Sequence, residues 1–287
     1  MKPCAFLTMD SLTGYVCYDH YLYEPFQKRG WQVTPISWRT ANVHWDDFRV
    51  VVIRSPWDYQ TDPARFLKVL EEIDQSAARL ENPLNIVHWN LNKRYLADLA
   101  EKGIPIVPTG WETTFDASRV VTYFETFDST EIIIKPVVSA NADNTFRLSQ
   151  NRFEPELPRL QSTFATRDFM VQPFRDHILH EGEFSLFFFG GEYSHTILKT
   201  PKPNDFRVQE EHGGRLRTID PEDKLLQRAT ETLAQIPPLL YARLDFVRHA
   251  GDFELMELEL IEPSLYFNMD ANSAERFADV FVRWVER

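Results

Sequence analysis

Cysteine is almost absent from this chain of 287 residues, which contains only Cys4 and Cys17. Two cysteines cannot form a disulfide framework, so a reducing compartment fits the composition best. The longest apolar stretches, such as residues 184–189, have the length of a strand and fall far short of a membrane span. The N-terminus, MKPCAFLTMD, lacks the apolar core of a secretory signal. We therefore expect a soluble, cytoplasmic protein without a membrane partner.

Positive charge is also in short supply, with 31 Lys and Arg against 43 Asp and Glu and a formal net charge of -12. A general nucleic-acid binder needs a basic surface, so we expect no nucleic-acid partner. A local basic pocket for a phosphorylated ligand remains compatible with this charge. Aromatic residues reach 14% of the chain, which argues against disorder. The length indicates two domains, or one large unit with subdomains.

Glycine is scarce, with 10 residues, and the motifs built on it are missing. We find no GxxxxGK[ST], no GxGxxG and no GxSxG. His180 and Glu181 begin a zinc-binding HExxH, but Phe184 stands where the second histidine is required. The sequence thus offers no marked nucleophile, and charged side chains must carry any chemistry.

Strands and helices alternate in the first ninety residues. We expect strands at 4–8, 32–36 and 50–54, and helices at 20–29 and 63–75. The third strand, VVVIR, is a continuous β-branched run, as in a parallel strand covered on both faces. This pattern predicts an α/β domain with a parallel sheet.

The remainder mixes antiparallel and helical signals. We expect helices at 92–102, 116–124, 155–161, 221–234 and 273–284, and strands at 132–135, 145–148 and 169–172. Two hairpins are expected at 183–199 and 240–259, with a polar loop over 200–217 between them. For the helix at 221–234, Asp220 is the expected N-cap, with Pro221 at the first position.

The second hairpin carries an acidic pattern in MELELIEPS. Because side chains two apart on a strand share a face, Glu257 and Glu259 project together. Met256, Leu258 and Leu260 are then expected to point the other way, into a core.

The hairpin turn also brings Asp245 beside that acidic pair, with Arg243 one step away on the same face. Hard carboxylate oxygens suit Mg²⁺, which usually takes one or two carboxylates together with substrate phosphates. A solvated acidic face of an amphipathic hairpin is the alternative. A cation beside carboxylates beside a metal is typical of a phosphoryl-transfer site.

Two lysines add to this pattern. Lys135 ends the strand IIIK, where an unpaired ammonium is costly to bury, and Lys93 lies near the start of an expected helix, where anions are welcome. Taken singly, each is more often a surface charge.

Together with the acidic hairpin, these segments resemble the ATP-grasp superfamily of carboxylate–amine ligases, in its glutathione-synthetase-like branch. No single segment is specific, but their order and spacing are. The segments are NLNKRYLADLAEKGIPIVPT (90–109), IIIKP (132–136), MVQPF (170–174), GEFSL (182–186), SHTILKTP (194–201) and NDFRVQEEHGG (204–214). The N-terminal segments 51–59 and 81–96 are most similar to the cyclo-ligases of cycloserine biosynthesis, which close an O-ureido-serine into a ring.

The resemblance implies an α/β protein with α+β elements and the ATP-grasp fold. Residues 1–88 would form a Rossmann-like substrate domain, 89–174 a small central lid subdomain, and 175–287 the C-terminal catalytic subdomain. It also implies binding of ATP and of two Mg²⁺ ions.

The resemblance further assigns roles to individual residues. Nucleotide would be bound by Lys93, Lys135, Gln172, Pro173, Phe174 and Glu183. Metal ligands would be Asp245, Glu257 and Glu259, the last often an asparagine in this family. Lys199, Arg207 and Arg243 would act on phosphate or carboxylate groups during catalysis, with Arg207 in a mobile loop that closes over an acyl phosphate.

One segment departs from the family. A glycine-rich loop usually follows the second lysine, whereas this chain has VVSANADNT at 137–145. Asn and Asp tolerate left-handed turns, so we expect this loop still to cover phosphate, with nucleotide affinity as the property at stake.

The N-terminal sheet should supply the substrate site. Arg54 ends a strand, where ligands bind in open α/β sheets, and Trp57 and Tyr59 follow in the adjoining loop. The guanidinium of Arg54 suits a small carboxylate or amino acid. A packed aromatic turn at a domain edge is the alternative.

The function expected from these residues is ATP-dependent C–N ligation of a small amino-acid-like carboxylate through an acyl phosphate, releasing ADP and phosphate. Ring closure within one molecule and ligation of two substrates both remain open. A kinase-like phosphotransferase, a non-catalytic nucleotide-binding protein and an unrelated acidic α/β domain are further alternatives. The oligomeric state, including a homo-oligomer, also remains open.

Overall fold

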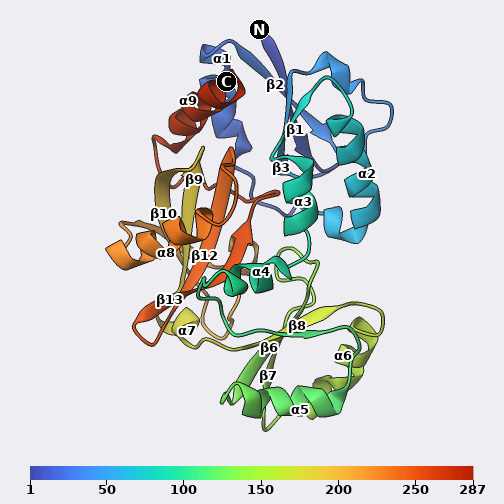
Figure 1. Cartoon of the computed structure of the whole chain (residues 1–287), viewed down its shortest axis with the longest axis vertical. Coiled ribbons are helices and arrows are strands. Elements are labelled where there is room, and N and C mark those ends of the chain that lie inside the picture. Colours follow the sequence, from blue (N-terminus) through green and yellow to red (C-terminus); the bar gives the residue numbers. More distant parts are fainter. Residues whose placement is uncertain (287) are drawn as a thin grey trace.

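Three β-sheets, one after another along the chain, form the framework of the protein (Figure 1). The computed structural model describes residues 1–286. The first sheet lies at one end of the molecule, the third in the middle and the second at the other end (Figure 1). Each sheet falls within one of the segments expected to be a domain. No helix of the described part of the chain has the length and apolar character that crossing a membrane requires.

The first sheet is parallel throughout, with strand order β2-β1-β3-β4. Its strands are β1 (Lys2–Thr8), β2 (Trp31–Ser37), β3 (Val50–Ser55) and β4 (Arg79–Glu81). The helices between and after them are α1 (Tyr23–Lys28), α2 (Pro63–Asp74) and α3 (Leu84–Asn90). The predicted parallel sheet is thereby confirmed.

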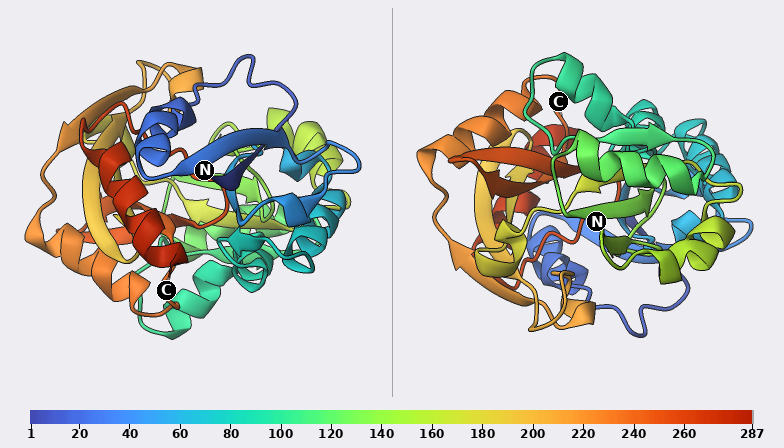
Figure 2. Two further views of the ribbon diagram at one scale, coloured as in Figure 1. Left: turned by 90° about the horizontal axis from the view of Figure 1, so that it is seen from above. Right: turned by 90° about the horizontal axis from the view of Figure 1, so that it is seen from below.

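Both faces of this sheet are covered, which explains the apolar run of β3. Val51 and Ile53 belong to a core that includes α2. Val50 and Val52 belong to another core, shared with α1 and with α9 (Ser273–Val285), which ends the chain. Helices α1 and α9 lie side by side in Figures 1 and 2, so the C-terminal helix covers the N-terminal sheet.

The second sheet is small and antiparallel, with strand order β5-β8-β6-β7. Its strands are β5 (Gly110–Glu112), β6 (Glu131–Pro136), β7 (Phe146–Ser149) and β8 (Phe169–Pro173). Helices α5 (Ala117–Thr126) and α6 (Leu157–Thr163) share its core, which is rich in phenylalanine. Helix α4 (Tyr95–Glu101) precedes it and packs into the core of the third sheet.

The third sheet is antiparallel, with strand order β11-β10-β9-β12-β13. Its strands are β9 (Glu183–Phe189), β10 (Glu192–Thr200), β11 (Arg215–Ile219), β12 (Tyr241–His249) and β13 (Asp252–Glu259). Helices α4 and α8 (Asp223–Leu233) share the core on one face, and α9 shares the core on the other. The short helix α7 (His177–His180) precedes β9.

Several predicted boundaries are wrong. The loop expected at 200–217 ends in strand β11. Helix α8 begins at Asp223, with extended Glu222 at its N-cap and no side chain capping the helix. The Glu222 side chain pairs with Arg248 instead. Neither Asp220 nor Pro221 has the position expected of it. Sequence analysis did not identify β4, α3, β5 or α7.

The largest local departure is in β13. The register with β12 shifts between Asp245 and Phe246, so Met256 is an extra residue that β12 does not match. A bulge of this kind lets two successive side chains face the same side. Met256 therefore lines the same cavity as Glu257, and the expectation that it points into the core beside Leu258 is wrong.

Candidate active site

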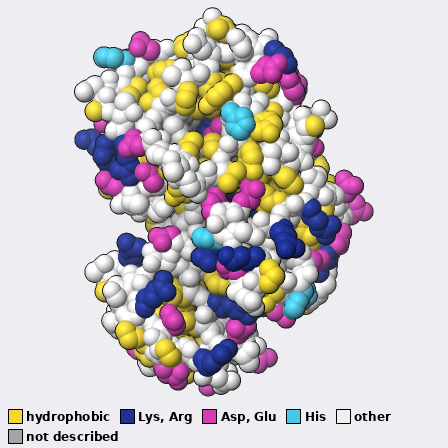
Figure 3. Space-filling model, turned by 180° about the vertical axis from the view of Figure 1, so that it is seen from behind, with side chains coloured by type: hydrophobic (Ala, Val, Ile, Leu, Met, Phe, Trp, Pro, Cys, Tyr) yellow, Lys and Arg dark blue, Asp and Glu magenta, His cyan; other side chains and the backbone are white. Residues whose placement is uncertain are grey.

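A large cavity lies where the three sheets meet, and it encloses about 1580 Å³ of open space that continues into solvent. Strands β6, β8, β9, β10, β12 and β13 contribute side chains to it, as do the loops after β3 and β13. In Figure 3 the outline of the molecule is indented where the lobe of the second sheet joins the rest. Most of the residues expected to bind nucleotide, metal and substrate line this cavity.

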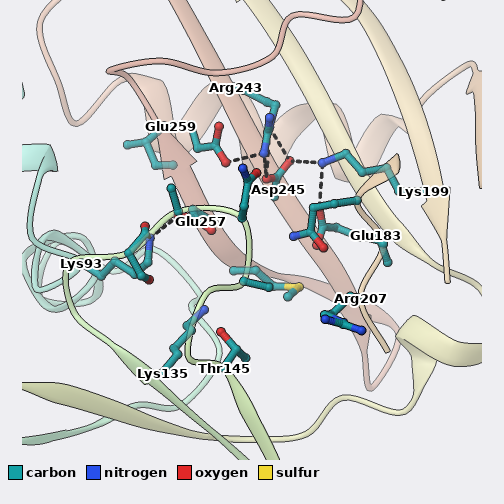
Figure 4. Close-up of a pocket in the computed structure, with 18 of the residues that line it drawn as sticks. Lys93, Lys135, Thr145, Glu183, Lys199, Arg207, Arg243, Asp245, Glu257 and Glu259 are labelled. Carbon is teal, nitrogen blue, oxygen red and sulfur yellow. Dashed lines mark hydrogen bonds and ion pairs between the residues drawn. The ribbon is translucent and has the colours of Figure 1, made fainter. Parts of the chain in front are cut away.

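The wall formed by β12 and β13 carries opposite charges in direct contact (Figure 4). Strand register places Arg243 opposite Glu259 and Asp245 opposite Glu257. The Arg243 Nη2 lies 2.9 Å from Asp245 Oδ2 and also pairs with Glu259. Burial would raise the pKa of Asp245, but Arg243 and Lys199 hold it below its ordinary value.

Strands β9 and β10 extend this network. The Lys199 Nζ lies 2.9 Å from Glu183 Oε1 and 3.5 Å from Asp245 Oδ1, and all three side chains are buried. The Ser185 hydroxyl donates to Asp245. The expected catalytic residues Lys199 and Arg243 and the expected nucleotide ligand Glu183 thus belong to one ion-pair network.

The two lysines differ in their partners. Lys93 precedes α4, pairs with Glu257 and donates to the Ser139 carbonyl at 3.2 Å. Burial would lower the pKa of Lys93, but the carboxylate of Glu257 raises it. The ammonium of Lys135, near the end of β6, has neither an ion pair nor a hydrogen bond with any residue from 1 to 286, and burial lowers the pKa of Lys135. Its ammonium faces the cavity (Figure 4).

The far end of the cavity is apolar and is bounded by the end of β8. Gln172, Pro173 and Phe174 all line it, as expected of an adenine hinge. The Gln172 amide donates to Thr109 Oγ1 at 3.0 Å, and the Phe174 backbone N–H donates to the Glu131 carbonyl at 2.9 Å.

Met256 completes the apolar end. Its side chain packs with Val107, Ile178, Val208 and Val247 in a small cluster. An apolar surface of this kind suits the base of a nucleotide. Sequence analysis missed Met256 because only the bulge in β13 turns it toward the cavity.

Two loops border the opening. In the segment 137–145, Asn141, Ala142 and Asn144 have positive φ, so the expectation that asparagine supplies left-handed turns here is confirmed. Arg207 lines the cavity and pairs with Asp205 at 2.9 Å. His212 contacts the Asn141 carbonyl at 3.4 Å, which links the two loops.

The 200–214 loop also touches the N-terminal region. The Tyr18 hydroxyl donates to Glu210 at 3.1 Å, and the Val16 backbone N–H donates to Glu211 at 3.3 Å. In this conformation the 200–214 loop therefore contacts both the 137–145 loop and the N-terminal region.

The expected metal ligands have the right chemistry but are engaged with basic side chains. No three Asp, Glu, His or Cys side chains within residues 1–286 form a cluster that could hold a metal by themselves. Asp245 and Glu259 are separated by the Arg243 guanidinium, and Glu257 is held by Lys93. Burial raises the pKa of Glu259, and the neighbouring carboxylates add to this despite Arg243. The carboxylate oxygens of Glu257 and Glu259 suit Mg²⁺, an ion whose remaining coordination positions are usually filled by phosphate oxygens and water.

The three expected substrate residues are not together. Trp57 and Tyr59 line the cavity. Arg54 is 1% exposed, does not line the cavity, and pairs with Asp19 at 2.9 Å. Its Nη2 also donates to the Pro263 carbonyl at 3.2 Å. In this conformation Arg54 anchors the loop after β13 and does not face open space.

Sequence analysis also missed Glu262 and Tyr266, which line the cavity from the loop after β13. Tyr266 has a φ of 46°, which is uncommon for a bulky residue. The only sequence signal for both was their place just after the acidic pair in ELELIEPSLY.

Comparison with known proteins gives close relatives. Residues 4–82 match the family model described as the N-terminal domain of the D-cycloserine synthetase DcsG. The cycloserine biosynthesis protein DcsG of Streptomyces lavendulae is 32% identical over 263 residues, which are 84% of this chain and 85% of that protein.

Solved structures agree. A crystal structure of D-cycloserine synthetase DcsG superposes with a TM-score of 0.87 at 30% identity, covering 99% of each chain. A D-alanine–D-alanine ligase from Bacillus anthracis gives 0.73 at 11% identity, over 100% of this chain and 98% of that one. The ATP-grasp ligase PsnB, complexed with a minimal precursor, gives 0.67 at 17% identity over 99% of each chain. The last two likenesses concern the fold alone.

Proposed function

The chain belongs to the DcsG family of ATP-grasp ligases, and on this basis we propose that it activates a small amino-acid-like carboxylate with ATP and joins it to nitrogen. The enzyme would release ADP and phosphate. Segments 1–88, 89–174 and 175–287 would act as the substrate, lid and catalytic units.

The observation that carries this proposal is the ammonium of Lys135, which has no partner among residues 1–286. It faces a cavity wall on which Lys199, Arg243 and Lys93 are all neutralised by carboxylates. A partly buried cation without a counter-ion is costly, and a polyphosphate would stabilise it. The apolar end beside Met256 would take the base of the same nucleotide.

The side chains present would bind and orient the reactants. Lys93 and Lys135 would hold the α- and β-phosphates, and Arg243 and Lys199 would face the γ-phosphoryl group. Glu257 and Glu259, with Asp245, would hold two Mg²⁺ ions. Bound Mg²⁺ supplies neutralisation of the charge on phosphate oxygens. The Lys93–Glu257 and Arg243–Glu259 contacts would open as nucleotide enters, because the same groups serve it.

The reaction would proceed in two displacements. An oxygen of the substrate carboxylate attacks the γ-phosphorus, the bond to the bridging oxygen breaks, and ADP leaves with that oxygen. A nitrogen lone pair then attacks the carbonyl carbon of the acyl phosphate, and inorganic phosphate leaves as the nitrogen loses its proton. The loops 137–145 and 200–214 would exclude water, which otherwise hydrolyses the acyl phosphate.

We further propose that the two reacting groups belong to one molecule, so that the new C–N bond closes a ring. The relative named for cycloserine biosynthesis, with the N-terminal match over residues 4–82, supports this form of the reaction. An O-ureido-serine would then be the substrate to test first. Ligation of two separate amino-acid substrates is the alternative outcome.

The test combines the protein with MgATP, hydroxylamine and a panel of amino-acid and ureido-amino-acid carboxylates. Hydroxylamine traps an acyl phosphate as a hydroxamate, so a hit identifies the carboxylate before its nitrogen partner is known. ADP and phosphate are followed in parallel, and product mass separates ring closure from hydrolysis. Lys135→Met should abolish the signal at low ATP, whereas Lys68→Met on the exposed side of α2 should not.

ADP release without phosphate release would indicate a phosphotransferase. Binding of MgATP without turnover of any carboxylate would favour a non-catalytic nucleotide-binding protein. Either result would overturn the proposed ligation.

A further inference from the structure

Glu262 lies in the loop that follows β13, at the side of the cavity formed by the N-terminal domain. It lines the cavity together with Trp57 and Tyr59 from the loop after β3. The Tyr59 hydroxyl adjoins the Glu262 carboxylate, and Tyr59 itself is buried. This corner is therefore built from two aromatic rings and one half-buried acid.

Among the cavity carboxylates that are not exposed, Glu262 differs in having no basic partner within residues 1–286. Of the lining acids that are not exposed, Glu183, Asp245, Glu257 and Glu259 each pair with a lysine or arginine. Glu262 has no ion pair with any described residue. Burial raises the pKa of Glu262 to about 7, although Lys93 and Tyr59 act in the opposite direction. A cation placed here would stabilise the ionised carboxylate.

The backbone around Glu262 is held rigidly by three side chains. The Trp57 Nε1 donates to the Glu262 carbonyl at 2.9 Å. Arg54 donates to the Pro263 carbonyl at 3.2 Å, and the Tyr241 hydroxyl donates to the Ile261 carbonyl at 2.9 Å. All three donors are buried, so the backbone that carries the Glu262 side chain is held in place before a ligand arrives.

We propose that Glu262, with Tyr59 and Trp57, binds the ammonium group of the substrate and so selects amino acids over simple carboxylic acids. The assignment rests on the proposed function, because it places the amino end of the molecule whose carboxylate is phosphorylated. A carboxylate and aromatic faces are together the usual receptor for an ammonium ion.

The rest of the cavity supports this orientation. Three basic side chains of the cavity can attract phosphate and the substrate carboxylate. Lys135 has no partner among the described residues, and Lys93 and Arg243 can exchange a present carboxylate partner for a ligand. All three repel an ammonium group. Glu262 is the non-exposed acid left available for that group. An amino acid would thus bind with its two charged ends toward opposite charges of the cavity.

The experiment compares paired substrates that differ only in the ammonium group. The pairs are O-ureido-serine with its deamino analogue 3-(ureidooxy)propionate, and serine with 3-hydroxypropionate. ADP release gives kcat/KM for each compound with the wild type, Glu262→Gln, Tyr59→Phe and the control Glu192→Gln, a surface acid outside the cavity. Equilibrium dialysis measures binding of O-ureido-serine to the same proteins.

For the wild type we expect a preference for the ammonium-bearing member of a pair. Glu262→Gln should lower that preference by about tenfold to hundredfold, the range for loss of a charge-assisted hydrogen bond. Tyr59→Phe should have a smaller effect in the same direction, and Glu192→Gln should have none.

An unchanged preference in an active Glu262→Gln enzyme would overturn the assignment, as would a wild type that shows no preference. If the wild type releases no ADP with any compound, the proposed function fails, and dialysis then decides. Binding that Glu262→Gln loses would still support the ammonium site, and equal binding or no binding would overturn it.

Discussion

The two walls of the cavity satisfy their charges in opposite ways (Figure 4). On the third sheet, Arg243 and Lys199 contact Asp245, and Lys199 also contacts Glu183. On the second sheet, Lys135 has no partner among the described residues and yet is partly buried. The basic side chains of the first wall are all paired with carboxylates without a ligand, whereas Lys135 on the second wall has no counter-ion among residues 1–286.

The difference has a physical cause. The third sheet shares its cores with helices on both faces and brings acids and bases together through strand register. Lys135 instead lies near the end of β6 in a smaller sheet, beyond the residues that pair with β7, and its side chain lines the cavity. We infer that the first wall sets the positions of the catalytic groups, and that the second supplies affinity for an anion that must arrive from solution.

The largest effect should come from removing a cation of the ion-pair network on the third sheet. Lys199→Met removes the cation shared by Glu183 and Asp245, and leaves buried carboxylates short of a partner. We expect a loss of about 3–5 kcal/mol in the free energy of unfolding, measured by urea denaturation. The control Lys224→Met breaks an exposed pair with Asp252 and should cost less than about 1 kcal/mol. Similar losses in both variants would show that the network is not what stabilises this wall.

Next in size is the effect of changing Glu257, the acid of the third-sheet wall that pairs with Lys93. Glu257 holds Lys93 in the present structure and would hold Mg²⁺ in the proposed reaction. Glu257→Gln should keep the fold and lower the rate of ADP release by about 10²–10³-fold, as for loss of one electrostatic group in an active site. Glu254→Gln, on the same strand but paired with Arg175, is the matched control. Full turnover in Glu257→Gln would exclude a role for this acid in metal binding.

Local patterns in the sequence predicted part of this site, and contacts between distant segments determined the rest. The parallel sheet was predictable because VVVIR is apolar on both faces, and the acidic hairpin was predictable from its alternation. The side-chain direction of Met256 was not, because one extra residue in β13 reverses it. Arg54 was expected to face a substrate, but it forms a buried ion pair with Asp19, which lies in a distant part of the sequence. Contacts between distant segments leave no periodic signal.

A smaller effect is expected from removing the ammonium of Lys135 on the second sheet. Lys135→Met removes an ammonium that pairs with no acid in the described part of the chain, so stability should stay equal or rise slightly. The KM for ATP should increase about tenfold to hundredfold, because a charge-assisted contact with phosphate is lost. Steady-state kinetics at varied ATP, with urea denaturation of the same variant, checks both parts. A large loss of stability would mean that Lys135 has a structural partner after all.

The smallest effect concerns pH and the unpaired acid Glu262. Its pKa is raised from 4.5 to about 7 in the folded state, so the native protein binds more protons than the unfolded chain between these values. Stability from this group is therefore complete below pH 4.5 and falls as pH rises through 7, with a slope of at most about 1.4 kcal/mol per pH unit. Urea denaturation from pH 5 to 8 should show a shallower decline for Glu262→Gln than for the wild type, while the control Glu192→Gln follows the wild type. Parallel curves for all three proteins would mean that the Glu262 carboxylate is already stabilised as an anion in the folded protein, and that it is not the uncompensated acid its lack of an ion pair indicates.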